Sequence, residues 1–579
     1  MSTLIVLSQM SPLPVAPMVD QATEWVTKTF SGLFGVVQDA GNAVMSTMTD
    51  TLLFFHPLVM IAVLTGLAYL LGRRKSARSF GLAVFTLIGL LFIYNQGLWT
   101  DLMNTLSLVL VASLLSVVIG IPLGIWMAKS DRVQQVINPI LDFMQTMPAF
   151  VYLIPAVAFF GIGMVPGVFA SIIFALPPTV RFTNLGIREV PRELVEASES
   201  FGSTGPQKLF KVELPLAKDT IVAGISQTIM LALSMVVTGS MIGAPGLGRG
   251  VLSALQKADI GNGFVNGLSL VILAIIIDRM MQLVNVKPQG KGLPSLWKKI
   301  LAGLAIAFLL LPSLASLFGG NKDNQGDTVK LAYVQWDSEI ASTNVIAEVL
   351  RQEGFTVEMT PLDNAVAWKS LADGSMDASV SAWLPVTHGD LAKEYEDQID
   401  DLGANLENVQ LGLAVPTYVG IDSISQLTTE AGSAITGIEP GAGIMNSAEE
   451  SLSVYSNLSS WTLEASSTGA MVTALDKAIK AEEPIVITAW SPHWMFAKYD
   501  LKYLEDPEGV FGAGENIHTL SRKGLAEDLP KAYQIIDQFF WEKEDMEAVM
   551  LDIADGMSEE EAAQKWISEH PEKVAEWTK

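Results

Sequence analysis

Three tryptophans stand at the ends of apolar runs, and two of them lie in similar segments. SVSAWLPVTH (379–388) and VITAWSPHW (486–494) both run from an apolar strand into Ala-Trp, any residue, Pro and a nearby His. Trp336 ends a third run, TVKLAYVQW (328–336). Open α/β sheets keep their ligand crevices at the carboxyl ends of strands. The sequence therefore predicts that Trp336, Trp383 and Trp490 form one cluster.

Such a cluster suits a quaternary ammonium ion. This cation has no N–H donor, so ordinary hydrogen bonds cannot hold it. Indole faces offer a negative quadrupole, which contributes roughly 0.5–2 kcal/mol per ring depending on desolvation, and they shelter the methyl groups. A carboxylate would attract lysine or a metal ion equally well. The remaining tryptophans are interpreted as packing residues, Trp494 among them.

Residues 328–579 alternate between strand and helix patterns, which predicts an α/β fold with two lobes. The expected strands are 328–336, 356–360, 377–383, 408–419 and 483–490, with a helix over 337–355. A polar linker at 321–327 precedes this domain. Residues 542–577 are interpreted as helices with a charged outer face.

The charge of the chain is distributed unevenly. Residues 1–326 hold 21 basic and 16 acidic residues, whereas residues 327–579 hold 15 and 45, and the whole chain carries −25. A hydrophobic fraction of 50% indicates a membrane protein. The acidic half argues against nucleic-acid binding. There is no cysteine, so disulfides and thiolate metal sites are excluded.

The first half contains charge-free windows long enough to cross a bilayer, which takes about 20 residues. They are Thr51–Gly72, Ser79–Thr100, Leu102–Ala128, Phe143–Val180, Thr220–Gly248, Ile260–Ile277 and Ile300–Asn321. GIGMVPG (161–167) divides the long fourth window into two spans joined by a tight turn. The sequence thus predicts about eight transmembrane helices: accessory spans within 51–98, a core within 99–286, and a last span within 287–320 that leads out to 328–579.

Basic residues gather in alternate loops, around 73–78, 129–132, 181–218 and 279–299. Cytoplasmic loops are enriched in Lys and Arg, so both chain ends are predicted to lie outside the cell membrane. Within 1–50, Val26, Phe30, Leu33, Val37, Ala40 and Val44 form an apolar stripe. We expect an extracytoplasmic helix lying in the membrane interface; packing against the spans is the alternative.

The cytoplasmic segment 196–217 reads EASESFGSTGPQKLFKVELPLA. Glu196, Ala197, Gly202, Leu214 and Pro215 match the spacing of the EAA loop that ABC-importer permeases use to contact their ATPase. The resemblance implies two short helices joined at Gly202, where glycine permits the bend, with Pro215 closing the second helix. These five residues are the predicted coupling residues.

Residues 145–167 and 242–282 resemble the permease of glycine betaine/proline betaine importers, and 328–579 resembles their binding proteins. The resemblance implies a type I ABC importer fold fused to a periplasmic-binding-protein-like domain, and it assigns the ligand cage to Trp336, Trp383 and Trp490. It further implies that His493 reaches the ligand's carboxylate. Backbone N–H groups near Ser338–Ile340 would assist, and His388 is the competing histidine.

The chain lacks the phosphate-binding sequence G-x-x-x-x-G-K-[ST]. ATP and Mg²⁺ are therefore expected on a separate ATPase, with no cofactor on this chain. Importers of the type that this chain resembles use two EAA loops, so the resemblance implies two copies of the ATPase and a chain that pairs with itself. No G-x-S-x-G, H-E-x-x-H or Cys nucleophile supports an enzyme. The resemblance implies uptake of glycine betaine for osmoprotection; the alternatives are an importer of choline, carnitine or an amino acid, and a membrane sensor that transports nothing.

Overall fold

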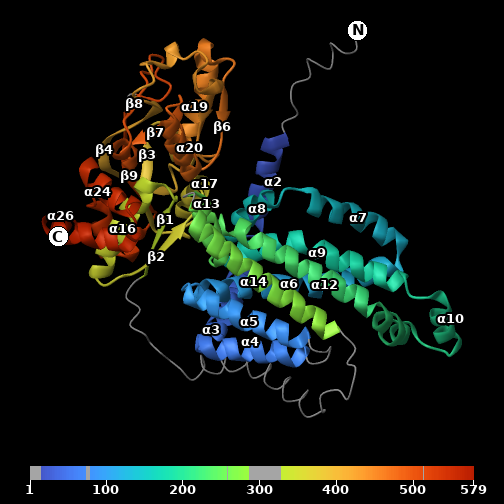
Figure 1. Ribbon diagram of the computed structural model, residues 1–579. Helices are drawn as coiled ribbons and strands as arrows, with labels where there is room; N and C mark the ends of the chain where they lie inside the picture. Colours follow the sequence, from blue (N-terminus) through green and yellow to red (C-terminus); the bar gives the residue numbers. More distant parts are fainter. Residues whose placement is uncertain (1–14, 73–77, 257–258, 286–327, 513) are drawn as a thin grey trace, which may run out of the picture. The chain divides into compact units, whose positions relative to one another are not determined.

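The computed structural model describes residues 15–72, 78–256, 259–285, 328–512 and 514–579 (Figure 1). The described residues belong to two compact units. One unit contains most helices of the first half, and the other contains residues 328–579. The predicted last span and the linker, 287–327, lie outside the described residues.

The described residues of the first half are mostly helical, as the charge-free windows predict. Most of the longer helices overlap these windows, and short helices lie between them. In chain order they are α2 (Val15–Thr29), α3 (Ser31–Phe54), α4 (Pro57–Gly72), α5 (Arg78–Asn95), α6 (Trp99–Lys129), α7 (Asp131–Thr146), α8 (Leu153–Phe160), α9 (Met164–Arg188), α10 (Arg192–Ser200), α11 (Gly205–Lys208), α12 (Leu214–Ser240), α13 (Leu247–Gln256) and α14 (Ile260–Asn285).

Four of these helical stretches are long and apolar enough to cross a membrane, and the number rises to six if two bent helix pairs are each one span. Of the eight predicted spans, the last lies outside the described residues, and the apolar part of α5, Phe80–Asn95, is shorter than the helices counted here as spans. The window Thr51–Gly72 is split in the structure: α3 runs on to Phe54, and α4 leaves it at 92°. The tight turn at 161–167 is confirmed, because Gly161 and Gly163 have φ of 63° and 111° between α8 and α9.

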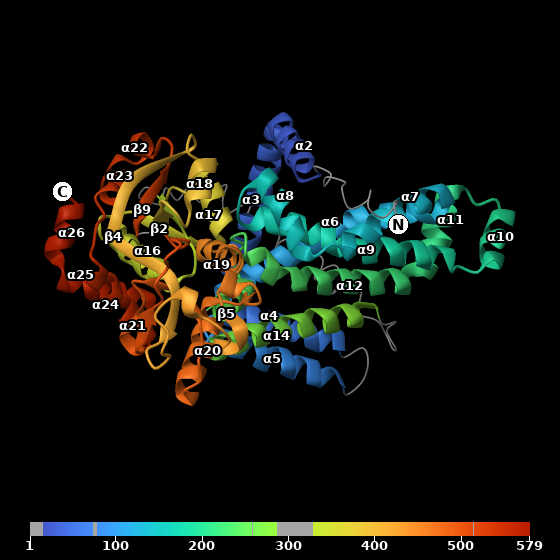
Figure 2. The ribbon, with the colours of Figure 1, turned by 90° about the horizontal axis from the view of Figure 1, so that it is seen from above.

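Helices α6, α9 and α12 pack closely, and both views show them side by side (Figures 1 and 2). A Cβ added to Gly124 of α6 would lie 2.6 Å from the carbonyl oxygen of Val180 in α9. A Cβ on Gly224 of α12 would lie 2.6 Å from the Cβ of Phe182. Small residues let helix backbones approach in a lipid environment, where dispersion rather than hydrophobic burial drives association.

The N-terminal apolar stripe remains exposed in the structure, including Phe30, Leu33, Val37 and Val44. The neighbouring face of α3 packs instead. Phe34 stacks on Phe159 with ring centroids 4.8 Å apart, and a Cβ on Gly41 would contact Val165. Helix α3 therefore packs on α8 and α9 through a face that the stripe did not identify, and its place in the membrane interface stays a prediction.

The segment with the EAA spacing forms α10, a turn at Gly202 with φ of 80°, α11, and a π-helical stretch over Leu209–Glu213. The bend at Gly202 is confirmed. The expectation that Pro215 ends the second helix is wrong, because Pro215 lies in the first turn of α12, which continues to Ser240. Proline is tolerated in a first turn, and the π-helical stretch before it absorbs the change in hydrogen bonding.

Residues 328–579 form two lobes around one path of strands, ordered β2-β1-β3-β9-β4-β7-β5-β6, with β8 paired to β4. The first lobe holds β1, β2, β3 and β9, and the second holds β5 to β8; Figure 1 shows the second lobe above the first. The strands are β1 (Thr328–Tyr333), β2 (Thr356–Pro361), β3 (Ala378–Leu384), β4 (Ile399–Pro416), β5 (Ala434–Thr436), β6 (Thr462–Glu464), β7 (Ile487–Ser491), β8 (Leu501–Tyr503) and β9 (Glu515–Arg522).

Strand β4 joins the lobes. Its first part pairs antiparallel with β9 and its last part with β7. Three register shifts interrupt the pairing with β9 between Asp401 and Val409, and such irregularities bend a strand. One 18-residue strand thereby belongs to both lobes. The sequence predicted only its second half, because the polar residues before Asn408 do not alternate.

Helices cover both lobes. In the first lobe, α16 (Asp337–Gln352) lies between the sheet and α25 (Glu559–Glu569), and nearly all of its residues are buried. In the second lobe, α19 (Gly443–Val454) packs against β4, β6 and β7. The predicted helices in 542–577 are confirmed as α24 (Lys543–Ala554), α25 and α26 (Pro571–Trp577).

Candidate functional site

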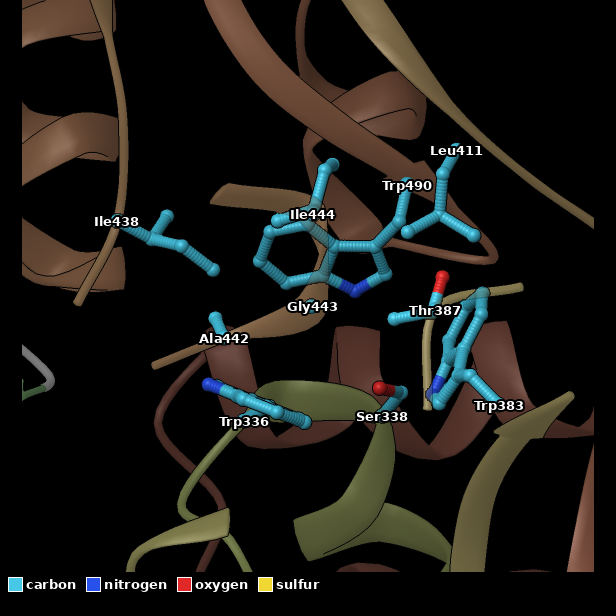
Figure 3. A pocket seen from close by; sticks show the side chains of 10 residues that line it. All are labelled: Trp336, Ser338, Trp383, Thr387, Leu411, Ile438, Ala442, Gly443, Ile444 and Trp490. Carbon is cyan, nitrogen blue, oxygen red and sulfur yellow. The ribbon is translucent and has the colours of Figure 1, made fainter. Parts of the chain in front are cut away.

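The three predicted tryptophans lie together at one cavity between the two lobes (Figure 3). About 310 Å³ of space in the cavity and at its open mouth is not filled by atoms. In Figure 3 the ring of Trp490 lies above and between the rings of Trp336 and Trp383, and all three rings border the same space. Their exposed fractions are 7%, 3% and 5% for Trp336, Trp383 and Trp490, so these large apolar rings are almost withdrawn from solvent.

Each tryptophan is placed by the end of a strand. Trp383 and Trp490 are each the second-last residue of their strands, β3 and β7, and Trp336 follows β1 as the residue before α16. The prolines of both similar segments follow cis peptide bonds, at Leu384-Pro385 and Ser491-Pro492. The strand-end placement that the sequence predicted is therefore confirmed for Trp383 and Trp490. The predicted strand 328–336 is too long, because β1 ends at Tyr333 and Trp336 lies in the connection to α16.

The lining combines apolar walls with a few polar groups, and no charged side chain belongs to it. From the first lobe come Trp336, Ser338, Trp383 and Thr387; from the second come Leu411, Ile438, Ala442, Gly443, Ile444 and Trp490. The hydroxyl of Ser338 is buried and has no hydrogen-bond partner among the described residues. An uncharged aromatic lining can hold a bulky cation through quadrupoles without giving it a hydrogen-bond acceptor.

The first turn of α19 is a part of the site that sequence reasoning missed. Gly443 and Ile444 begin this 12-residue helix and line the cavity. The first N–H groups of a helix have no partner within it, and they attract anions together with the helix dipole. The one signal in the sequence was the loop PGAG before the helix.

The N–H groups near Ser338–Ile340 fit the expectation only in part. Ser338 lies at the cavity, but the N–H of Ile340 donates to the carbonyl of Trp336 at 2.8 Å. Glu339 accepts the N–H of Val334 at 2.8 Å, and burial raises the pKa of its carboxyl well above the usual range. These hydrogen bonds are made by neighbouring residues of the first turn of α16, and they hold Trp336 at the N-terminus of that helix.

His493 is buried behind Trp490 and does not line the cavity. Its ring meets the Trp490 ring edge-to-face with centroids 4.7 Å apart. Its Nδ1 accepts the N–H of Met495 at 3.1 Å, and its Nε2 lies 3.2 Å from a carboxylate oxygen of Asp337. Since Nδ1 accepts, Nε2 must carry the proton and donate to Asp337. A direct contact between His493 and a ligand stays a prediction.

His388 has a different environment, entirely within the first lobe. Its ring stacks on Trp336 with centroids 6.0 Å apart, and its Nδ1 accepts the N–H of Trp383 at 3.1 Å. Burial lowers the pKa of His388 to about 3, which leaves it neutral at ordinary pH. His388 therefore supports two of the cage rings from behind.

Several contacts cross the cleft beside the cavity. The indole N–H of Trp336 donates to Glu439, the Asp337–His493 pair lies next to it, and the side-chain amide of Asn364 donates to the carbonyl of Gly441 at 3.5 Å. A Cβ on Gly443 would lie 2.2 Å from the carbonyl oxygen of Thr387, so only glycine permits this approach of the two lobes. The lobes are closed on each other in this structure.

The predicted coupling residues lie on a different part of the chain, in α10, its Gly202 turn and the start of α12. Glu196, Ala197 and Pro215 are exposed, and Leu214 is half-buried. Two residues that the sequence reasoning did not single out are the most prominent there: Phe201 is 90% exposed and Phe210 is 67% exposed. An ion pair of Lys208 with Glu199 joins the two arms of the turn.

Two family models match the chain. Residues 120–287 match the binding-protein-dependent transport system inner membrane component, and residues 327–569 match the substrate-binding domain of the ABC-type glycine betaine transport system. The first match lies in the helical half of the chain, and the second covers most of the α/β domain.

Relatives of known function resemble each half. The glycine betaine/carnitine transport permease protein of Listeria monocytogenes is 53% identical over 279 residues, which is 48% of this chain and 98% of that protein. The glycine betaine transport system permease protein of Bacillus subtilis is 46% identical over 49% of this chain and 99% of that protein.

Among solved structures, a lactococcal substrate-binding protein in its closed, liganded conformation with glycine betaine is 52% identical. It covers 44% of this chain and 100% of its own, with a TM-score of 0.43. The two family models and the permease relatives together cover both halves of the sequence. This chain therefore belongs to the glycine betaine ABC transport family, and it joins a membrane permease component and a substrate-binding domain in one polypeptide.

Proposed function

We propose that this chain is the permease and receptor of an ATP-driven importer of glycine betaine, serving osmoprotection. The observation that carries the proposal is the cavity walled by Trp336, Trp383 and Trp490 with no charged side chain in its lining. Such a lining suits a trimethylammonium group, and it gives a primary ammonium no carboxylate to pair with. An ordinary amino acid is therefore a poorer fit.

The other end of the ligand is a carboxylate in this proposal. The first turn of α19, at Gly443 and Ile444, offers backbone N–H groups, and Ser338 and Thr387 offer hydroxyls. These donors favour glycine betaine over choline, which has no carboxylate. His493 can take part if the ligand's carboxylate replaces Asp337 as the acceptor for its Nε2 proton.

In this proposal a separate ATPase binds Mg²⁺ and hydrolyses ATP. Two copies of that ATPase assemble with two copies of this chain in the membrane. The coupling residues Glu196, Ala197, Gly202, Leu214 and Pro215 border the exposed Phe201 and Phe210. Exposed aromatic side chains beside a rigid turn are typical of a protein interface. The receptor domain lies outside the cell membrane in this proposal, and the distribution of basic loops supports that orientation.

The transport half of the proposal is tested with the full chain and its ATPase in proteoliposomes. ATP inside the vesicles should drive uptake of radiolabelled glycine betaine, and Phe201→Glu should abolish both uptake and co-purification of the ATPase. Leu551→Glu is the control, since Leu551 is an exposed apolar residue of the receptor domain and lies outside the segment 196–217. Ligand binding without any ATPase association would instead support a sensor.

The choice of solute is tested by competition. Unlabelled glycine betaine and proline betaine should displace the label at the lowest concentrations. Choline should compete poorly, because it leaves the α19 donors without an anion. Displacement by glycine or proline at the same concentration as glycine betaine would overturn the assignment of a quaternary ammonium ligand.

A further inference from the structure

Trp336 is the one cage ring whose polar edge is held by the opposite lobe. Its indole N–H donates to Oε1 of Glu439. Trp336 follows β1 in the first lobe, whereas Glu439 follows β5 in the second, 103 positions along the chain. A hydrogen bond to an ionised acceptor is about twice as strong as one between neutral groups. The bond therefore ties the orientation of this ring to the position of the other lobe.

Glu439 is itself fixed within the second lobe. Its Oε2 accepts the backbone N–H of Thr468 at 3.0 Å and lies 3.3 Å from the Thr468 hydroxyl. Thr468 is the first residue of α20 (Thr468–Ala481), so the carboxylate lies at a helix N-terminus, which stabilises its negative charge. The charge of Glu439 also contributes, after burial, to raising the pKa values of Glu339 and Asp363.

The other contacts of the Trp336 ring are with residues of the first lobe. His388 stacks on it, and the ring borders the cavity beside Ser338. Figure 3 shows the indole nitrogen of Trp336 directed away from the two other rings. Glu439 does not line the cavity. It therefore acts on the edge of the ring and leaves the ring face to the ligand.

We propose that Glu439 is a positioning residue that orients Trp336 only when the two lobes are closed, and that it thereby couples completion of the aromatic cage to closure. The proposal rests on the proposed function of the cavity. When the lobes separate, the indole N–H and the carboxylate part, and the ring loses the contact that fixes its plane. A cation bound between the three rings is then released more quickly.

A double-mutant cycle on the full chain in detergent tests this coupling, with radiolabelled glycine betaine as the probe. Glu439→Ala should weaken binding about tenfold, which corresponds to about 1.4 kcal/mol, mainly through faster dissociation. Trp336→Phe keeps an aromatic face but lacks the N–H. Adding Glu439→Ala to Trp336→Phe should change affinity less than twofold, because no donor remains for Glu439 to hold.

Two controls separate this coupling from a general effect. Adding Glu439→Ala to Trp490→Phe should still cost the full tenfold, since Trp490 does not contact Glu439. Glu464→Ala removes the same charge from an exposed position of the same lobe and should bind as wild type. Glu439→Gln keeps one acceptor oxygen, so its affinity should lie between those of wild type and Glu439→Ala even if the alanine variant folds poorly.

The outcomes distinguish the inference from the proposed function. Glu439→Ala binding as tightly as wild type, or costing tenfold also in the Trp336→Phe background, would overturn the role of Glu439 and leave the cage intact. Failure of the wild-type chain itself to bind glycine betaine would overturn the proposed function.

Discussion

The two similar segments, 379–388 and 486–494, use their tryptophans alike and their histidines differently. Trp383 and Trp490 both end a strand and both border the cavity. His388 stays inside its own lobe and supports Trp336, whereas His493 reaches across the cleft to Asp337. A local pattern thus fixed the position of the rings, and the surroundings of each segment decided what its histidine does.

This difference separates two kinds of contribution to binding. The three rings border the ligand cavity, and Gly443 allows the two lobes to approach each other, so both contribute to binding directly. The histidines act through a neighbour: His388 through Trp336 and Trp383, and His493 through Asp337 and Trp490. Variants of the first kind should therefore have larger effects than variants of the second.

The largest effect is expected for Trp490→Ala, with about a hundredfold loss of affinity for glycine betaine, or about 2.7 kcal/mol. The variant removes one cation–π wall and leaves an open gap on the second-lobe side. Equilibrium binding on the full chain measures it. Trp494→Ala in the same segment is the control, because Trp494 does not line the cavity, and equal losses in both variants would contradict the comparison.

Gly443→Ala should weaken binding at least tenfold. The new Cβ would lie 2.2 Å from the carbonyl oxygen of Thr387, so the lobes could not close fully. Gly420→Ala is the matched control, because a Cβ there meets open space. Small-angle scattering with saturating ligand should show Gly443→Ala more extended than wild type; the same compact particle in both would argue against a steric block.

His493→Gln and Asp337→Asn should each weaken binding about fivefold, since either change weakens the same contact across the cleft. The two changes combined should cost little more than one alone, which binding titrations measure. If His493 instead holds the ligand's carboxylate by itself, Asp337→Asn will leave affinity unchanged while His493→Gln reduces it. The pair thus sharpens the role of the second histidine.

The smallest effect concerns His388, and it acts on stability. Its pKa is about 3 in the folded protein, whereas an unperturbed histidine has a pKa of 6.5, so the unfolded chain binds the proton more readily. Stability is therefore fully present above pH 6.5 and falls as the pH drops from 6.5 towards 3. Between pH 7 and 5.5 the loss is about 1 kcal/mol.

Calorimetry of the full chain should show this loss at the transition of the receptor domain. His388→Leu should flatten the dependence in that pH range, whereas His570→Leu, at a half-buried position far from the cavity in sequence, should leave it as in wild type. An unchanged slope in His388→Leu would show that another group is responsible.

Much of the fold was predictable because it depends on short-range patterns. Apolar windows without charges can only be buried or placed in lipid, and Gly161 and Gly163 mark a turn that a bulky side chain would resist. Pro215 was misjudged for a local reason too: the π-helical stretch before it lets the helix continue, and the sequence around it carries no sign of that stretch.

The second-lobe wall of the site was not predictable. Ile438, Gly443 and Ile444 follow a three-residue strand, and their segment contains no tryptophan. Strand β9, which pairs with β3 and β4, also lacks the apolar run that marks the other strands. The pairing of β9 joins residues more than a hundred positions apart, and β5 is positioned by β6 and β7, which come later in the chain.

The sequence by itself determined a membrane half, an acidic α/β half, and three strand-end tryptophans, because hydropathy, charge and side-chain periodicity act over a few residues. Only the tertiary structure decided that Glu439 holds Trp336, that His493 meets Asp337, and that Gly443 passes close to Thr387. Those contacts cross the cleft between two lobes that the bent strand β4 connects. Their geometry depends on how the lobes close, and no local pattern determines it.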